Sequence, residues 1–215
     1  MKLSDKIFST LRDRIVNLEY PPETRLSEEE LCKEFGVSRT PLREALQQLS
    51  EMNLIQSIPR YGTVVKSINI NDVRNAYEVK IHLESLAGSL AAQRITSAQM
   101  EKLRTLREDY KVALQRGEST LEIDISFHEG VYEATQNDVL ERSLKRLTSC
   151  CVRLCRLLIP QRLGTPHCLM SISEIFDALE ARDAELSARA CQQHAQYYYD
   201  LIWQAAVGDR SIGRA

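Results

Sequence analysis

Residues 36–46 read GVSRTPLREAL, and this run indicates a helix-turn-helix. Before it, the capping box Ser27-x-x-Glu30 opens one helix, which the glycine at the start of the run ends. Ser38 then caps a second helix, predicted over residues 39–52. Pro41 falls in the first turn of that helix, where a missing N–H costs nothing. Two short helices joined by Gly-Val-Ser are typical of a helix-turn-helix.

The flanking segments predict a winged form of this motif. An amphipathic pattern predicts a first helix over residues 3–19, which ends where Tyr20-Pro21-Pro22 forbids continuation. Behind the helix-turn-helix, two β-rich runs, residues 54–58 and 63–65, flank the turn Pro59-Arg60-Tyr61-Gly62 and predict a hairpin. A hairpin in this position is a wing.

The second helix of the motif begins with side chains suited to DNA. A recognition helix presents its N-terminal residues to base edges in the major groove. Arginine can pair bidentately with guanine, Ser and Thr can donate to phosphates, and a helix N-terminus favours anions. The alternative for any single arginine is a solvated surface side chain. The predicted DNA-binding residues are Ser38, Arg39, Thr40 and Arg43 on the helix and Arg60, Tyr61 and Gly62 at the wing tip.

Net charge does not point to DNA. Residues 1–66 hold ten Lys or Arg and ten Asp or Glu, and the whole chain has a formal charge of −2. Nucleic-acid binders often show a basic excess. The prediction therefore depends on the placement of a few arginines and not on a basic domain.

From residue 70 onward the pattern is helical, with few Gly or Pro. The predicted fold class is mainly α. A winged helix-turn-helix over residues 1–68 is followed by an antiparallel all-α helical bundle over residues 69–215. The predicted helices of the bundle span residues 70–95, 97–116, 119–135, 138–159, 169–181 and 184–207.

The cysteines and the chain start indicate a cytoplasmic protein. None of the six cysteines forms a C-x-x-C pair, and Cys150 and Cys151 are adjacent, so we expect reduced thiols. The start MKLSDKIF has no apolar signal core, and no run of 18 apolar residues occurs, so no membrane partner is expected.

The N-terminal pattern resembles the winged helix of the GntR family of repressors over about 60 residues. The resemblance implies a DNA-binding transcription regulator that is a homodimer on double-stranded operator DNA. One departure is Glu29, where some relatives carry a phosphate-binding arginine, so that contact is absent or comes from Arg25. The matching residues are Ser27, Glu28, Leu31, Phe35 to Leu46, Leu49, Leu54, Ile55, Arg60 to Thr63 and Val65.

Residues 70–207 resemble the all-helical FCD ligand-binding domain of the FadR-type branch. Many FCD domains hold a divalent metal such as Zn²⁺ with one Asp and three His. Asp124 and His128 match two ligands, and their i,i+4 spacing puts both on one helix face. His194 matches a third ligand. The fourth position is Ile172, which cannot ligate, so the site has three protein ligands or is empty.

The spacing also allows other interpretations of these residues. His128 could be an ordinary buried histidine, and Asp124 could pair with it or with a nearby arginine. Near position 172, Cys168 lies one turn earlier, and His167 is a further candidate with a poorer phase.

The resemblance implies a small organic acid as effector in this domain. The candidate effector-binding residues are Lys80, Arg153, Arg156 and Asn137. Relatives often have arginine at position 80, and lysine binds a carboxylate as a point charge instead of bidentately. Arg153 and Arg156 could equally be surface residues. Two alternatives stay open: a metal-free regulator with an apolar effector, and a metal-dependent enzyme.

Overall fold

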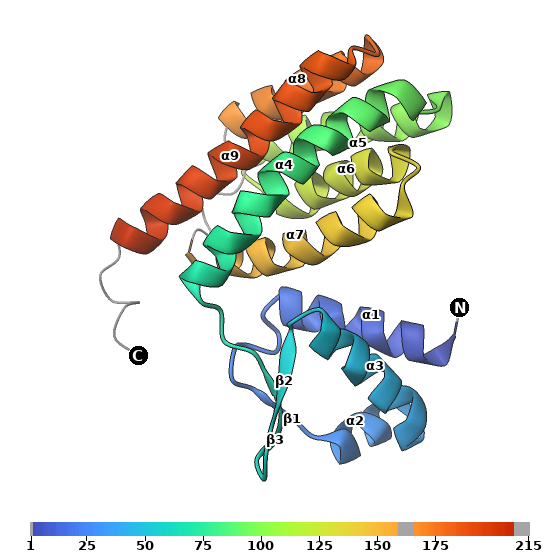
Figure 1. Ribbon diagram of the computed structural model, residues 1–215, viewed down its shortest axis with the longest axis vertical. Coiled ribbons are helices and arrows are strands. Elements are labelled where there is room, and N and C mark those ends of the chain that lie inside the picture. The colour runs from blue at the N-terminus through green and yellow to red at the C-terminus, as the bar shows by residue number, and fades with distance from the viewer. Residues whose placement is uncertain (1, 159–165, 209–215) are drawn as a thin grey trace.

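The computed structural model describes residues 2–158 and 166–208 of the chain. Figure 1 shows a small N-terminal unit below a larger bundle of helices. In chain order the elements are α1 (Leu3–Val16), β1 (Arg25–Leu26), α2 (Glu28–Phe35), α3 (Arg39–Glu51), β2 (Ile55–Ile58), β3 (Gly62–Val65), α4 (Ile70–Arg94), α5 (Ser97–Gln115), α6 (Leu121–Ala134), α7 (Asp138–Leu158), α8 (Pro166–Glu180) and α9 (Ala184–Gly208). The mainly α fold class is confirmed.

The N-terminal unit is a winged helix. Helices α1, α2 and α3 share a core in which Leu11, Ile15, Leu42 and Leu49 are completely buried. The sheet is antiparallel with strand order β1-β3-β2, so the predicted hairpin is the β2–β3 pair. Strand β1 was not predicted, because two residues are too few to show an alternating pattern.

The helix ends of this unit follow local backbone chemistry. Helix α1 ends at Val16, three residues before the predicted end, since Leu18 takes a left-handed φ of 62°. The side chain of Ser27 accepts a hydrogen bond from the backbone N–H three residues on, as predicted. Gly36 ends α2 with φ 63°, a conformation that glycine adopts without strain. Ser38 occupies the N-cap of α3, but its side chain forms no capping hydrogen bond within the described residues.

Helices α4 to α9 form the bundle, and α4 lies along α9 in the opposite direction (Figure 1). All six predicted helices of this region are present, with bounds that agree to within three residues. The core is mainly aliphatic but contains large rings with at most 2% exposure, among them Tyr110, Phe127, Tyr132 and Phe176. Among the helices described, none is long and apolar enough to cross a membrane.

The two units meet at a short linker between β3 and α4. Arg153 of α7 donates a hydrogen bond from Nη2 to the carbonyl oxygen of Lys66 in this linker, at 2.7 Å. Helix α1 also contacts α7. The bundle therefore touches the winged helix directly and not only through the chain connection.

Candidate functional site

The start of α3 is an exposed polar edge of the winged helix. Ser38, Arg39, Thr40 and Arg43 are all solvent-exposed, while the other side of α3 is buried in the core. Arg43 Nε donates to Glu28 Oε2 at 3.0 Å, so α2 holds this guanidinium beside the recognition face. Sequence reasoning did not assign Glu28 this role, because the pair joins two helices.

The wing brings a further cation to this end of the molecule. The guanidinium of Arg25, on β1, lies over the ring of Tyr61, with the guanidinium carbon Cζ 5.6 Å from the ring centre. Its Nε would be 3.5 Å from a Cβ placed on Gly62. Arg60, with φ 65°, occupies the tight turn and is exposed. The structure therefore groups Arg25 with the wing tip, whereas Glu29 pairs with Lys33.

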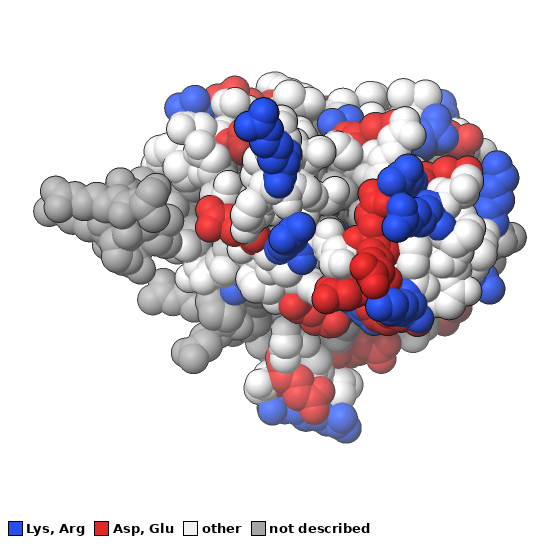
Figure 2. Space-filling view, turned by 90° about the horizontal axis from the view of Figure 1, so that it is seen from below, with Lys and Arg blue, Asp and Glu red and all other residues white. Residues whose placement is uncertain are grey.

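Charges of both signs cover this end. Figure 2 views the molecule from the winged-helix end and shows acidic side chains between the basic ones. This agrees with the balanced composition of residues 1–66. Contact with DNA at this end would depend on particular arginines, because no broad basic field is present.

A second cluster lies inside the bundle. Asp124 and His128 on α6 and His194 on α9 offer ligand atoms that all lie within 4.8 Å of one another. His194 Nε2 is 3.7 Å from Asp124 Oδ1, and the two imidazole ring centres are 4.6 Å apart. All three residues are buried. The i,i+4 spacing on α6 thus brings its two residues together with a side chain 66 positions further along the chain.

Burial controls the charges in this cluster. It raises the pKa of Asp124 to about 7, against the lowering effects of Lys80 and of the Tyr198 hydroxyl, which donates to the carboxylate. Burial, with the charge of Lys80, lowers the pKa of His128 to about 3. Burial and His128 lower the pKa of His194 well below its ordinary value. Both imidazoles are therefore neutral near pH 7, the form in which histidine binds metals.

The tautomer of His194 follows from Ser171 on α8. The Ser171 hydroxyl donates to the carbonyl oxygen of Cys168 at 2.9 Å, and Ser171 Oγ is 2.8 Å from His194 Nδ1. Since that hydroxyl has one proton, His194 Nδ1–H donates to Ser171 Oγ. The lone pair of Nε2 then faces Asp124, and Nε2 has no other partner among the described atoms. The sequence did not indicate a role for Ser171. The predicted fourth ligand position was the next residue, Ile172.

A buried ion pair lies beside the cluster. Lys80 of α4 is paired with Glu84, and the Tyr132 hydroxyl donates to the same Glu84 oxygen. The other Glu84 oxygen, Oε2, is 3.8 Å from His128 Nδ1 and has no hydrogen bond within the described part of the chain. Asp124, His128 and His194 line a small cavity at the centre of the bundle, the central cavity, and Lys80 lines it too, as expected. Glu84 neutralises much of the charge of Lys80.

Three candidate effector residues, Arg153, Arg156 and Asn137, do not line this cavity. Arg153 contacts the domain linker, because its side of α7 faces the junction. Arg156 is paired with Glu122 near the surface. Asn137 accepts hydrogen bonds from the backbone N–H groups of residues 139 and 140, so it caps the start of α7.

The fourth ligand position is filled by hydrocarbon. Ile172 is completely buried in the main core. Cys168 is also buried but does not line the central cavity, and His167 contacts Tyr197 with tilted rings whose centres are 4.2 Å apart. The cavity itself has a volume of about 40 Å³, enough for an ion and a water molecule or two.

A winged helix with an exposed recognition helix, joined to a helical bundle with a buried polar cluster, defines a DNA-binding regulator with a sensory domain. Comparison with known families agrees. Residues 3–65 match "Bacterial regulatory proteins, gntR family" and residues 75–197 match "FCD domain". The chain belongs to the GntR family of transcription regulators, in the branch with an FCD domain. It is a regulator and not an enzyme.

Individual relatives support this assignment. The HTH-type transcriptional repressor RspR of Escherichia coli K12 is 30% identical over 205 residues, which cover 94% of this chain and 90% of that protein. A probable D-xylose utilization operon transcriptional repressor of Paenarthrobacter nicotinovorans is 30% identical over 80% of this chain and 76% of its own length. The structure of E. coli McbR/YncC has a TM-score of 0.84 at 20% identity, covers 96% of this chain and 99% of its own, and so shares the fold.

Proposed function

We propose that this chain is a repressor that binds a pseudo-palindromic operator as a homodimer and responds to a small organic acid in its bundle. The winged helix, residues 1–68, would contact DNA, and residues 69–215 would dimerise and bind the effector. The exposed start of α3, with Arg39 and Arg43 beside the wing, is the observation that most supports the DNA-contacting residues. Loss of operator binding on removal of these arginines is the direct test.

The face of α4 and α7 that points away from the core supports dimerisation. Val79 and Leu86 on α4 are 51% and 45% exposed, and Val139 on α7 is 67% exposed. Leu83, between the two α4 residues, is half-buried. Exposed apolar side chains that cluster on one face mark a surface for association with another chain, whereas singly scattered ones do not. A second copy packed here would bring two recognition helices onto one operator.

Replacing Leu86 with glutamate should break the dimer, because it puts a charge into the apolar interface without a partner. Light scattering coupled to size-exclusion chromatography measures the mass directly. Val112→Glu is the matched control, since Val112 on α5 has a similar exposure of 43% but lies outside this face. A dimer that persists in the Leu86 variant would contradict the assignment of the face.

The buried cluster supports a divalent metal. Two neutral imidazoles and a carboxylate converge with unpartnered ring nitrogens, a donor set that Zn²⁺ accepts with three protein ligands. Asp124, His128 and His194 would hold the ion. When bound, it would supply a positive charge to which an effector carboxylate could coordinate.

Elemental analysis of the purified protein should find one divalent metal per chain, and His128→Ala should abolish it. Ser171→Ala should lower the affinity about tenfold, because groups that orient a ligand typically contribute tenfold or more. Affinity should also fall below about pH 7, since the metal competes with the proton on Asp124.

His82→Ala is the control for this experiment, as this exposed histidine on α4 lies outside the cluster. Protein that represses fully and contains no metal after growth in zinc, iron, manganese or nickel would favour the metal-free alternative.

A further inference from the structure

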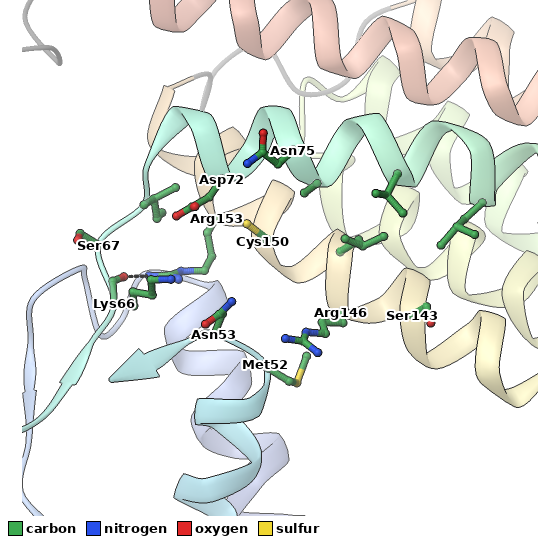
Figure 3. Close-up of a pocket in the computed structure, with 15 residues that line it drawn as sticks. Met52, Asn53, Lys66, Ser67, Asp72, Asn75, Ser143, Arg146, Cys150 and Arg153 are labelled. Atoms are coloured by element: carbon green, nitrogen blue, oxygen red, sulfur yellow. Dashed lines mark hydrogen bonds between the residues drawn. The ribbon is translucent and has the colours of Figure 1, made fainter. Parts of the chain in front are cut away.

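A large pocket lies at the junction of the two domains, away from the Asp124 cluster. It has a volume of about 480 Å³. Figure 3 shows that its walls come from the end of α3, the linker, the start of α4 and the outer side of α7. Met52, at the end of α3, lines it, whereas Arg39 begins that helix about 20 Å away at 1.5 Å per residue. The pocket is therefore separate from the expected DNA contacts.

Three cations line this pocket against one acid. Lys66, Arg146 and Arg153 face Asp72, and none of the four forms an ion pair with any residue that the structure describes. Figure 3 shows the Arg153 guanidinium beside Lys66, with Arg146 further along α7 next to Met52. The pocket thus has an excess of two positive charges without counter-ions.

Arg153 makes this excess costly. Its exposure is only 3%, and its one hydrogen bond is the donation from Nη2 to the Lys66 carbonyl, which leaves Nε without a partner among the described atoms. A buried guanidinium normally has a carboxylate beside it, because an unpaired buried charge is strongly unfavourable. An anion in the pocket would remove this penalty.

The remaining wall is apolar. Ile68 from the linker, Ala76, Val79 and Leu83 from α4, and Leu147 from α7 line it. A small inorganic anion would leave this surface in water, and a polyanion would approach Asp72. The surface and the charge together suit an anion with a hydrocarbon body.

We propose that the junction pocket binds an aliphatic carboxylate, with its carboxylate at Lys66, Arg146 and Arg153 and its chain along Ile68 and Leu147. This site is additional to the proposed effector site at Asp124. Its walls belong to both domains, so an occupant would bridge the linker and α7 and resist movement of the winged helix relative to the bundle.

Isothermal titration calorimetry with sodium octanoate tests this site on the full chain. We expect one molecule per chain, and 1-octanol should bind at least about tenfold more weakly, because it lacks the charge. Lys66→Gln with Arg146→Gln should weaken octanoate binding by about tenfold or more. These two side chains are not in the core, so the variant should fold. Arg142→Gln, an exposed arginine of α7 outside the pocket, should leave binding unchanged.

Other outcomes overturn the proposal. Binding that is lost in His128→Ala but kept in the Lys66 and Arg146 variant would place octanoate in the central cavity. Equal binding of octanol and octanoate would show that only the apolar wall matters. If no octanoate binds and the Lys66 and Arg146 variant instead weakens the dimer, a carboxylate of the second copy is the counter-ion.

Discussion

Replacing Arg39 and Arg43 together with alanine should weaken operator binding about 100-fold or more. Each arginine that pairs with a base contributes about 1–3 kcal/mol, and about 1.4 kcal/mol is tenfold in affinity. Both side chains are exposed at the start of α3. The ion pair of Arg43 with Glu28 is a surface pair, so exchanging it for DNA costs about 1 kcal/mol or less.

Fluorescence anisotropy with a labelled promoter fragment at fixed salt measures this effect. Arg74→Ala with Arg189→Ala is the matched control, because it removes two charges that form i,i+4 surface pairs in the bundle. It should change affinity little. Undiminished binding by the Arg39 and Arg43 variant would show that DNA is contacted elsewhere.

Gly88→Ala should destabilise the bundle by about 3 kcal/mol, although alanine normally favours a helix over glycine by about 1 kcal/mol. Gly88 lies where α4 packs against α9. A Cβ there would overlap the backbone carbonyl oxygen of Ser187, with the carbonyl carbon only 2.8 Å away. Neither helix backbone can move without separating the most extensive contact in the bundle. Urea unfolding followed by circular dichroism measures the loss.

Gly130→Ala is the matched control in the same bundle. A Cβ at Gly130 would meet Leu103 Cδ2 at 2.7 Å, which is the far end of a flexible side chain. Leu103 can change rotamer, so the expected loss is about 1 kcal/mol or less. If both variants lose the same free energy of unfolding, the contact between α4 and α9 adjusts more easily than the close approach at Gly88 implies.

The elements of this fold could be predicted from sequence because their signals are local. Ser27 and Gly36 mark the two ends of α2, and Thr96 with Gln99 forms a capping box at the start of α5. Periodic apolar residues then place each helix within a few residues. The two-residue strand β1 was not predicted, since only its pairing with β3, about 38 residues later, identifies it as a strand.

The candidate sites were predictable only in part. Asp124 and His128 share a helix face by spacing alone, whereas His194 needed a family resemblance. Ser171, which selects the tautomer of His194, carries no pattern that marks it. Glu84 stands at i,i+4 spacing from Lys80 on α4, but that spacing does not show that the pair is buried beside His128 and Tyr132. Their roles depend on contacts between α8 and α9 and between α4 and α6.

By itself, the sequence determined the order, type and approximate bounds of the helices, the helix-turn-helix with its wing, and the residues exposed at the start of α3. Each of these depends on interactions within a few residues of the chain. Only the tertiary structure decided where the long cations point. Lys80, Arg153 and Arg156 all sit on bundle helices, yet one meets a buried glutamate, one the domain linker and one a surface acid. Arg153 and Arg156 reach partners on other elements, whereas Lys80 pairs within α4 and the neighbouring helices bury that pair, so packing between helices determines the environment of all three.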